Sequence, residues 1–178
     1  NKYDIFYRAH VQGIGWMNWV SNGAIAGTTG QGLRMEAIQI ILLAKDGSIV
    51  QDSSPNNNIL FVYGTLMNGQ RSHSYMDGAL FLGSAVLTGY DMYNITNYPA
   101  LVPGGTKSQV KGELYVVSDD KLAYLDWMED EGRMYKRVKA TATALSGQQY
   151  NAYVYEWMKG TEGYRQVPLS EQPWSQWR

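Results

Sequence analysis

The sequence predicts an α+β protein in two parts: a small β-rich unit at the N-terminus and a larger domain whose strands form a small mixed β-barrel with flanking helices. The chain has 14 Tyr, 6 Trp and 19 Gly, and only 17% of its residues are charged, which favours strands and tight turns over a helical bundle. Runs of alternating polar and apolar residues also recur along the chain. Its 178 residues allow one large core or two small ones.

The domain organisation follows from a change in composition. Residues 51–58 are Gln, Asp, Ser, Pro and Asn, which bury almost nothing and favour turns. We therefore predict a β-rich unit over residues 1–50, a linker over residues 51–57 and a second domain over residues 58–178.

The N-terminal unit contains two expected strands, residues 5–11 and 35–42, on either side of a glycine-rich segment. That segment carries Trp16 and Trp19, which we expect to be largely buried in a core; the alternative is exposed rings that stack on a ligand. His10 lies in an alternating strand, and we interpret it as a structural residue.

Five short motifs in this unit closely resemble the clostridial hydrophobic repeat with its conserved tryptophan. They are Gly15-Trp16, Trp19-Val20, Asn22-Gly23, Ala26-Gly27-Thr28-Thr29-Gly30-Gln31 and Arg34-Met35-Glu36-Ala37-Ile38. The resemblance covers about residues 3–43. It implies an extracellular or cell-surface location, with a cell-surface or wall component as the partner of the repeat. A single copy is either the remnant of a longer array or packs on the second domain.

The second domain begins with an apolar run typical of a strand buried on both faces, which ends at Gly64. A turn follows, and then an expected short helix over residues 72–80. A longer helix over residues 118–129 opens with the capping residue Ser118. The predicted strands of this domain are residues 59–63, 84–87, 110–117, 136–141 and 150–157.

The residue types present exclude several functions. The 15 Lys and Arg are scattered and balanced by 16 Asp and Glu, so no basic face for a nucleic acid is visible. Without cysteine, and with His10 and His73 as the only histidines, we expect no metal site and no cysteine nucleophile. The longest apolar runs are shorter than the roughly 20 residues that span a membrane. A nucleophile elbow and a phosphate loop are also missing.

What remains is a backbone anion site and a carboxylate. The strand that ends in Tyr63-Gly64-Thr65-Leu66 turns on a glycine, and successive N–H groups in such a turn can converge on a carboxylate. Glu129 ends an apolar helical face, three residues after Asp126. Taken alone, Glu129 would be an ordinary solvated or paired acid.

The second domain resembles the γ-glutamylcyclotransferase-like superfamily, in the branch of γ-glutamylamine cyclotransferase and the AIG2-like proteins. The resemblance covers about residues 58–178. It rests on five motifs in one order: Val62-Tyr63-Gly64-Thr65-Leu66 with Gly69-Gln70, Tyr98-Pro99-Ala100-Leu101-Val102-Pro103-Gly104, Val110-Lys111-Gly112-Glu113-Leu114-Tyr115, Leu125-Asp126-Trp127-Met128-Glu129 and Tyr135-Lys136-Arg137.

The resemblance implies a barrel with a cavity at its mouth and no cofactor. Tyr63, Gly64, Thr65 and Leu66 match the substrate-binding turn, and Glu129 matches the general acid/base. Tyr135 is either a substrate contact or a core residue. The family usually reads Leu-Asp-x-Phe/Tyr-Glu-Gly, whereas here Met128 replaces the aromatic residue and Asp130-Glu131 precede the glycine. Glu131 is therefore a competing candidate.

The implied activity is that of a γ-glutamyl cyclotransferase on small free γ-glutamyl amines or peptides, with release of an amine and 5-oxoproline. The alternative is a non-enzymatic cell-surface binding protein that keeps the pocket without turnover.

Overall fold

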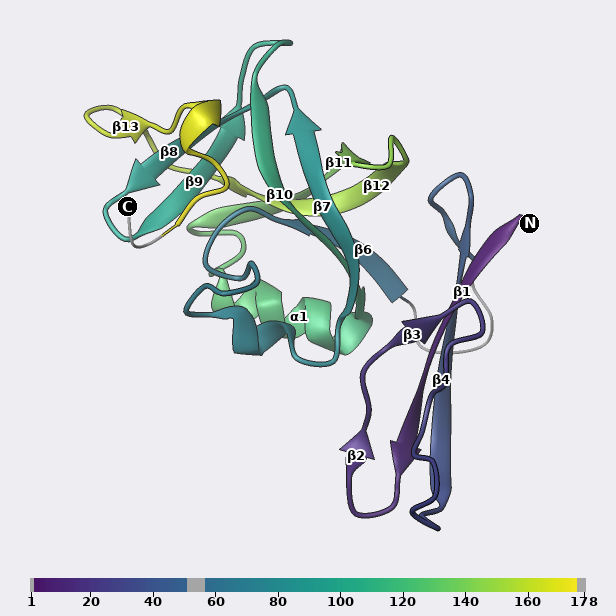
Figure 1. Cartoon of the computed structure of the whole chain (residues 1–178). Helices are drawn as coiled ribbons and strands as arrows, with labels where there is room; N and C mark the ends of the chain where they lie inside the picture. Colours follow the sequence, from purple (N-terminus) through teal and green to yellow (C-terminus); the bar gives the residue numbers. More distant parts are fainter. Residues whose placement is uncertain (1, 51–56, 176–178) are drawn as a thin grey trace. The chain divides into compact units, whose positions relative to one another are not determined.

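The structure is a computed structural model that describes residues 2–50 and 57–175. The chain divides into two compact units between Ser54 and Pro55 (Figure 1). Of the predicted linker over residues 51–57, residues 51–56 lie outside the described residues, and Asn57 is the first residue of a strand. The two units are described separately below.

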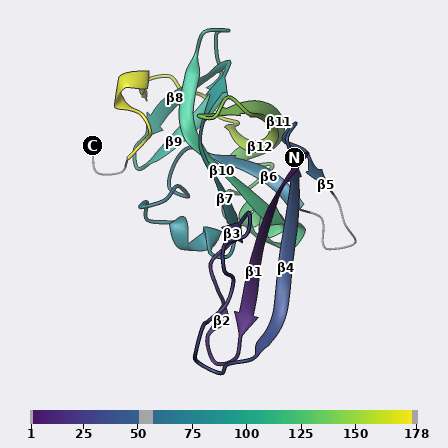
Figure 2. The same cartoon turned by 45° about the vertical axis from the view of Figure 1, so that its right-hand side comes forward.

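The N-terminal unit is one antiparallel sheet. Strands β1 (Tyr3–Val11) and β4 (Met35–Ala44) form its centre, and Figure 2 shows them as a long pair. The strand order is β2 (Gly15–Trp16), β1, β4 and β5 (Ile49–Val50), with β3 (Val20–Ser21) also paired to β1. Both predicted strands of this unit are present, and each is longer by two residues.

The expected burial of the tryptophans is wrong for Trp16, which is 41% exposed, while Trp19 is partly buried. The physical reason is that the described residues of this unit form a single sheet, with no second layer of their own to cover its faces. The rings pack instead against the Arg8 guanidinium, which lies 5.0 Å from the Trp16 ring centroid and 4.8 Å from that of Trp19. His10 meets the Trp16 ring edge-on and lies 3.2 Å from a Glu36 carboxylate oxygen.

The second unit is built on a closed barrel, which confirms the predicted α+β class with a small mixed β-barrel. The strand order around the barrel is β10-β6-β12-β11-β7, in which only β12 and β6 run parallel. The strands are β6 (Asn57–Val62), β7 (Leu80–Thr88), β10 (Gln109–Ser118), β11 (Tyr135–Ala144) and β12 (Gln149–Trp157).

The central strand β6 shows why the sequence forms this barrel. Its last four residues, Ile59-Leu60-Phe61-Val62, are all buried, as expected for a strand that is covered on both faces. It pairs with β10, where Gly112 allows the two backbones to approach. A Cβ atom at Gly112 would lie 2.2 Å from the Val62 carbonyl oxygen, so no larger residue fits without a shift.

Helix α1 (Asp119–Met128) confirms the longer helix prediction. The Ser118 side chain accepts a hydrogen bond from the Lys121 N–H at 3.3 Å, and Leu122 and Leu125 are buried against the barrel. The predicted helix over residues 72–80 is wrong: only a 3₁₀ turn, η1 (His73–Met76), forms there. It ends because Asp77 is extended and Gly78 has a φ of +83°.

A small second sheet of this unit was not predicted from the sequence. It consists of the hairpin β8 (Tyr90–Ile95) and β9 (Tyr98–Pro103), with β13 (Arg165–Gln166) beside β8 (Figure 1). A second 3₁₀ turn, η2 (Leu169–Glu171), follows. Strand β9 contacts β12 of the barrel and thereby becomes one wall of the cavity described next.

Candidate active site

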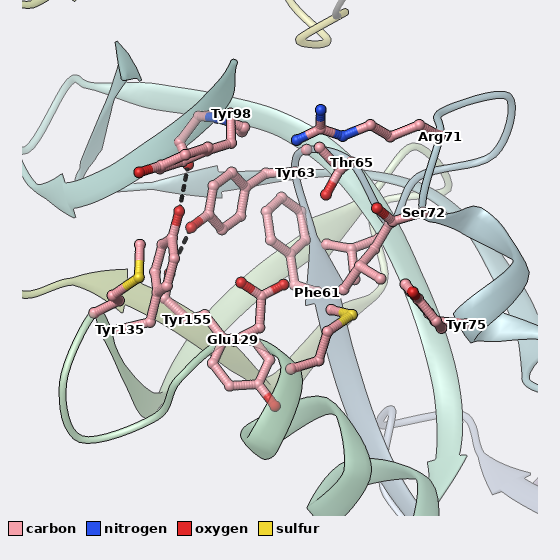
Figure 3. Close-up of a pocket in the computed structure, with 16 residues that line it drawn as sticks. Phe61, Tyr63, Thr65, Arg71, Ser72, Tyr75, Tyr98, Glu129, Tyr135 and Tyr155 are labelled. Carbon is pink, nitrogen blue, oxygen red and sulfur yellow. Dashed lines mark hydrogen bonds between the residues drawn. The ribbon is translucent and has the colours of Figure 1, made fainter. Parts of the chain in front are cut away.

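A cavity lies where the end of β6, the hairpin strand β9 and the end of α1 come together (Figure 3). Its walls are mostly aromatic and apolar. The lining residues are Phe61, Val62, Tyr63, Gly64, Thr65, Leu66, Arg71, Ser72, Tyr75, Tyr98, Pro99, Met128, Glu129, Met134, Tyr135 and Tyr155. The structure thus brings all six sequence-predicted site residues, Tyr63, Gly64, Thr65, Leu66, Glu129 and Tyr135, around one space, while their chemical roles stay predictions.

The turn after β6 presents unused hydrogen-bond donors. The backbone N–H groups of Gly64, Thr65 and Leu66 donate to no acceptor in the described part of the chain, whereas the Met67 N–H closes the turn on the Gly64 carbonyl at 3.0 Å. Three neighbouring N–H groups without a protein acceptor form a suitable site for a carboxylate.

Contacts from outside hold this turn in place. The Thr65 carbonyl accepts from the Ser72 N–H at 3.1 Å, and the Leu66 carbonyl lies 2.9 Å from His73 Nδ1. The Glu113 carboxylate accepts from the Asn68 N–H at 2.8 Å. These hydrogen bonds fix the backbone of the turn at one end of the cavity.

The position of Gly64 has no room for a side chain, because the backbone there lies close to Pro99. A Cβ atom there would lie 2.4 Å from Pro99 Cγ on β9, far inside contact distance. The absence of a side chain at this position lets the turn and β9 form adjacent walls of the cavity.

Among the residues that the structure describes, Glu129 is the one acid that lines the cavity. It caps the C-terminal end of α1, where its N–H donates to the Leu125 carbonyl at 2.9 Å, and its carboxylate points into the cavity (Figure 3). The residue keeps some exposed surface, but its carboxylate is enclosed by aromatic and methionine side chains. Burial therefore raises the pKa of Glu129 from its ordinary value of 4.5 to about 7.

Asp126, one helical turn earlier, has a different environment. Its two carboxylate oxygens accept hydrogen bonds from Arg137 Nη1 and from the Tyr155 hydroxyl, each at 2.8 Å. Both oxygens are thus engaged in a fixed network, and Asp126 does not line the cavity. Burial and the bond to Asp126 raise the pKa of Tyr155, which keeps its proton.

Two further tyrosine hydroxyls donate their hydrogens to backbone carbonyls. Tyr63 donates to the Tyr155 carbonyl at 2.7 Å, and Tyr135 donates to the Pro99 carbonyl at 3.0 Å (Figure 3). Burial raises the pKa of both tyrosines. They are therefore neutral residues of fixed orientation. The Tyr135 ring packs against the Trp157 ring, with 5.1 Å between the ring centroids.

The structure also separates Glu129 from its competitor Glu131. Glu131 is exposed and lies outside the cavity lining. Asp130 has a φ of +52°, the left-handed conformation that usually falls to glycine directly after a helix. Asp130 thus takes the conformation that favours glycine at the end of a helix, and α1 still ends with Glu129 in the cavity.

Sequence reasoning missed part of the lining. Arg71, Ser72 and Tyr75 form one end of the cavity, and Tyr155 comes from β12. Tyr155 lies in a predicted strand, but nothing in the sequence indicates which cavity that strand faces. Arg71 directly follows the Gly69-Gln70 motif, and this position in the sequence could have indicated that it lies near the cavity.

The part of the chain that the structure describes holds no group of three His, Asp or Glu residues that could bind a metal ion. Within that same part, no helix has the length and apolar character needed to cross a membrane.

Comparison with known proteins gives two family matches. Residues 60–176 match the family "Gamma-glutamyl cyclotransferase, AIG2-like", and residues 10–44 match "Clostridial hydrophobic W". The first match spans more than half of the chain. The protein belongs to the AIG2-like gamma-glutamyl cyclotransferase family. Both resemblances predicted from the sequence are thereby confirmed.

Individual relatives agree with this assignment. The "Gamma-glutamylcyclotransferase family protein ytfP" of Citrobacter rodentium is 32% identical over 104 residues, which cover 58% of this chain and 85% of the relative. The "Gamma-L-glutamyl-butirosin B gamma-glutamyl cyclotransferase" of Niallia circulans is 30% identical over 127 residues, covering 67% of this chain and 76% of the relative. The crystal structure of a mouse AIG2-like protein has a TM-score of 0.55 and 28% identity, covering 60% of this chain and 81% of the mouse chain.

Proposed function

We propose that this cyclotransferase-family protein releases an amine and 5-oxoproline from small free γ-glutamyl compounds, with Glu129 as the general acid and base. One observation carries the proposal: a carboxylate whose pKa is raised by burial to about 7 shares a cavity with a turn that offers three unused N–H donors. A γ-glutamyl compound presents the matching groups, an α-ammonium and an α-carboxylate.

Binding at the turn supplies the geometry of the reaction. The N–H groups of Gly64, Thr65 and Leu66 hold the α-carboxylate of the substrate. The α-amine then lies on the side of Glu129 and folds back toward the γ-carbonyl. Holding the two reacting atoms of one molecule close together lowers the entropic part of the barrier.

The chemistry needs one proton-transfer group and no cofactor. Glu129 accepts a proton from the α-ammonium, and the free amine attacks the γ-carbonyl carbon. A new bond forms between that carbon and the α-nitrogen, and Glu129 returns its proton to the leaving nitrogen as the bond between that nitrogen and the γ-carbon breaks. The α-nitrogen gives up a second proton on becoming the amide nitrogen of 5-oxoproline, and Glu129 passes this proton to the released amine, which leaves as an ammonium. A positioned acid/base of this kind contributes typically 10²–10⁴-fold, and a pKa near 7 suits both roles.

Tyr135 supplies a second hydrogen-bond acceptor for the α-ammonium of the substrate, beside Glu129. The hydroxyl oxygen of Tyr135 uses its hydrogen on the Pro99 carbonyl, so it faces an incoming ammonium as an acceptor. Because its pKa is raised by burial, Tyr135 stays neutral and does not compete with Glu129 for the catalytic proton.

The mechanism limits the substrate class. Cyclisation requires a free α-amine, so an intact cell-wall stem peptide, whose glutamyl nitrogen is acylated, is not a substrate. Burying an acylated nitrogen beside Glu129 would also leave a polar group poorly paired, at a cost of about 1–3 kcal/mol. The match to the clostridial hydrophobic repeat supports an extracellular or cell-surface location, where free γ-glutamyl peptides released from larger polymers would be encountered.

The experiment measures 5-oxoproline release from γ-glutamyl dipeptides and γ-glutamyl amines. We expect turnover by the full chain, a loss of at least 100-fold in Glu129→Gln, and near-normal activity in the matched control Glu131→Gln. Amine release from an N-acylated γ-glutamyl peptide without 5-oxoproline would show a hydrolase instead. Binding without any turnover would favour the non-enzymatic binding protein.

A further inference from the structure

We infer that Arg71 makes the cavity selective for γ-glutamyl compounds whose leaving amine carries its own carboxylate, namely γ-glutamyl amino acids and peptides. The inference rests on the proposed function and goes beyond it by naming the substrate class. It assigns a specificity role to a residue outside the substrate-binding turn.

The charges around the cavity are few. In the described part of the chain, Glu129 and Arg71 are the only lining residues that carry a full charge. Arg71 forms no ion pair with any residue in the described ranges, and its Nη2 donates at 3.3 Å to the Asn97 carbonyl. A single long hydrogen bond leaves most of the five guanidinium donors for a ligand.

Arg71 reaches across the mouth of the cavity. Its backbone follows the substrate-binding turn, while its side chain contacts Asn97 in the tight connection between β8 and β9. Figure 3 shows the guanidinium above Thr65, directed toward the side of Tyr98. It is therefore placed to contact a bound molecule and not merely the loop it belongs to.

The two ends of the cavity differ in exposure, and this difference gives the direction of the substrate. The carboxylate of Glu129 is enclosed, whereas Arg71 is exposed and Tyr75 is 40% exposed. The reacting γ-glutamyl part belongs at the enclosed end, since its amine must meet Glu129. The leaving group then extends toward Arg71, Ser72 and Tyr75.

Pairing each charged group of the substrate with a group of the cavity indicates that the leaving amine carries a carboxylate. The α-ammonium is matched by Glu129, and the α-carboxylate by the N–H groups of Gly64, Thr65 and Leu66. Arg71 remains as a second anion site at the leaving-group end. A guanidinium binds a carboxylate through two parallel hydrogen bonds, whereas a cationic leaving amine would be repelled.

The test compares γ-glutamyl-alanine with γ-glutamyl-ethylamide, which differ only by the carboxylate of the leaving amine. For the full chain we expect kcat/KM to be about tenfold higher for the dipeptide, which is the size of effect expected for an exposed charge-assisted hydrogen bond. This preference should become smaller as salt is added, because salt screens exposed charges. Arg71→Met should abolish the preference, Arg71→Lys should keep part of it, and the exposed control Arg165→Met should keep all of it. The variant is first checked for an unchanged circular-dichroism spectrum.

Several outcomes would overturn the inference. An equal loss on both substrates in Arg71→Met would mean that Arg71 holds the α-carboxylate instead, and no change in the ratio would mean that it reads no carboxylate. If the full chain turns over neither substrate, the proposed function fails, and calorimetric binding to Glu129→Gln decides the inference separately. Tighter binding of the dipeptide that is lost on adding Arg71→Met supports it; equal binding, or binding of neither compound, overturns it.

Discussion

Replacing Glu129 by Gln should abolish catalysis and at the same time stabilise the fold above neutral pH. Enclosure makes the ionised carboxylate unfavourable in the folded protein, because burial raises its pKa from 4.5 to about 7. Between these two values the folded chain binds more protons at this site than the unfolded chain. Stability is therefore lost as the pH rises through this window, and the loss is complete above about pH 7.

The size of the effect follows from the same two pKa values. Each pH unit corresponds to about 1.4 kcal/mol, so ionised Glu129 costs up to about 3 kcal/mol above pH 7. Because the cavity opens to solvent, this figure is an upper bound. Glutamine has nearly the same shape without the charge, so we expect Glu129→Gln to raise the free energy of unfolding by about 1–3 kcal/mol at pH 8 and by almost nothing at pH 4.

The assay is denaturant unfolding of the full chain between pH 4 and pH 8, with Glu131→Gln as the matched control. Glu131 is exposed, so its variant should follow the wild-type curve at every pH. The reasoning would be refuted if Glu129→Gln were less stable than the wild type at pH 8. It would also be refuted if the difference between them did not change with pH, since a charge penalty must vanish on protonation.

Four further predictions follow from the same geometry. The kcat/KM for a γ-glutamyl substrate should fall as the pH decreases below about 7, because protonated Glu129 cannot act as the base; a profile that is flat down to pH 5 would contradict this. Gly64→Ala should lower activity at least 100-fold and destabilise the fold by about 1–3 kcal/mol, since its Cβ would strike Pro99; activity assays and urea unfolding measure both effects. Asp130→Gly should stabilise the chain by about 1 kcal/mol by relieving its left-handed conformation, and an unchanged unfolding midpoint would disprove the strain. A truncated chain that begins at residue 58 should keep the activity of the full chain, because every residue that lines the cavity follows residue 60; a folded but inactive fragment would show that the N-terminal unit is needed.

The elements that could be predicted from the sequence are those with a strong local signal. The apolar run of β6 has no alternation, so it indicates a strand covered on both faces, and the structure buries it completely. Ser118 marks the start of α1 because its side chain satisfies a free N–H of the first turn. The boundaries of both elements were therefore correct to within about two residues.

The hairpin of β8 and β9 was missed because its strands depend on tertiary contacts. Its buried residues Met92, Ile95, Ala100 and Leu101 become core only when the hairpin lies against the barrel. The predicted helix over residues 72–80 failed for a related reason. The loop is held by Ser72, His73 and Glu113 through hydrogen bonds to the turn at residues 63–66 and its neighbour Asn68, and these bonds favour a compact turn over a regular helix.

Only the residues of the candidate site that lie within recognisable motifs could be predicted from the sequence. Glu129 and the turn at residues 63–66 occur in a recognisable order, whereas the roles of Tyr155 and Arg71 depend on where β12 and the loop after the turn lie in space. The exposure of Trp16 likewise follows from the sheet around it. Its own neighbours in the sequence do not reveal whether a second layer covers the ring.

If the proposed function holds, the walls and the mouth of the cavity make different contributions to substrate recognition. Met128 and Met134 both line the cavity, and methionine side chains are flexible enough to adapt to differently shaped ligands. Such walls enclose Glu129 and raise its pKa, and we expect them to select weakly among leaving groups. We expect a fixed charge to select more strongly, and among the described residues Arg71 is the one cation that lines the cavity. Replacing Met128 by Phe should therefore change kcat/KM for γ-glutamyl compounds with bulky leaving amines more than it changes the preference for a carboxylate that we infer for Arg71. Measuring kcat/KM for γ-glutamyl-alanine, γ-glutamyl-ethylamide and a γ-glutamyl compound with a bulky amine checks this, and a larger change in the carboxylate preference would contradict it.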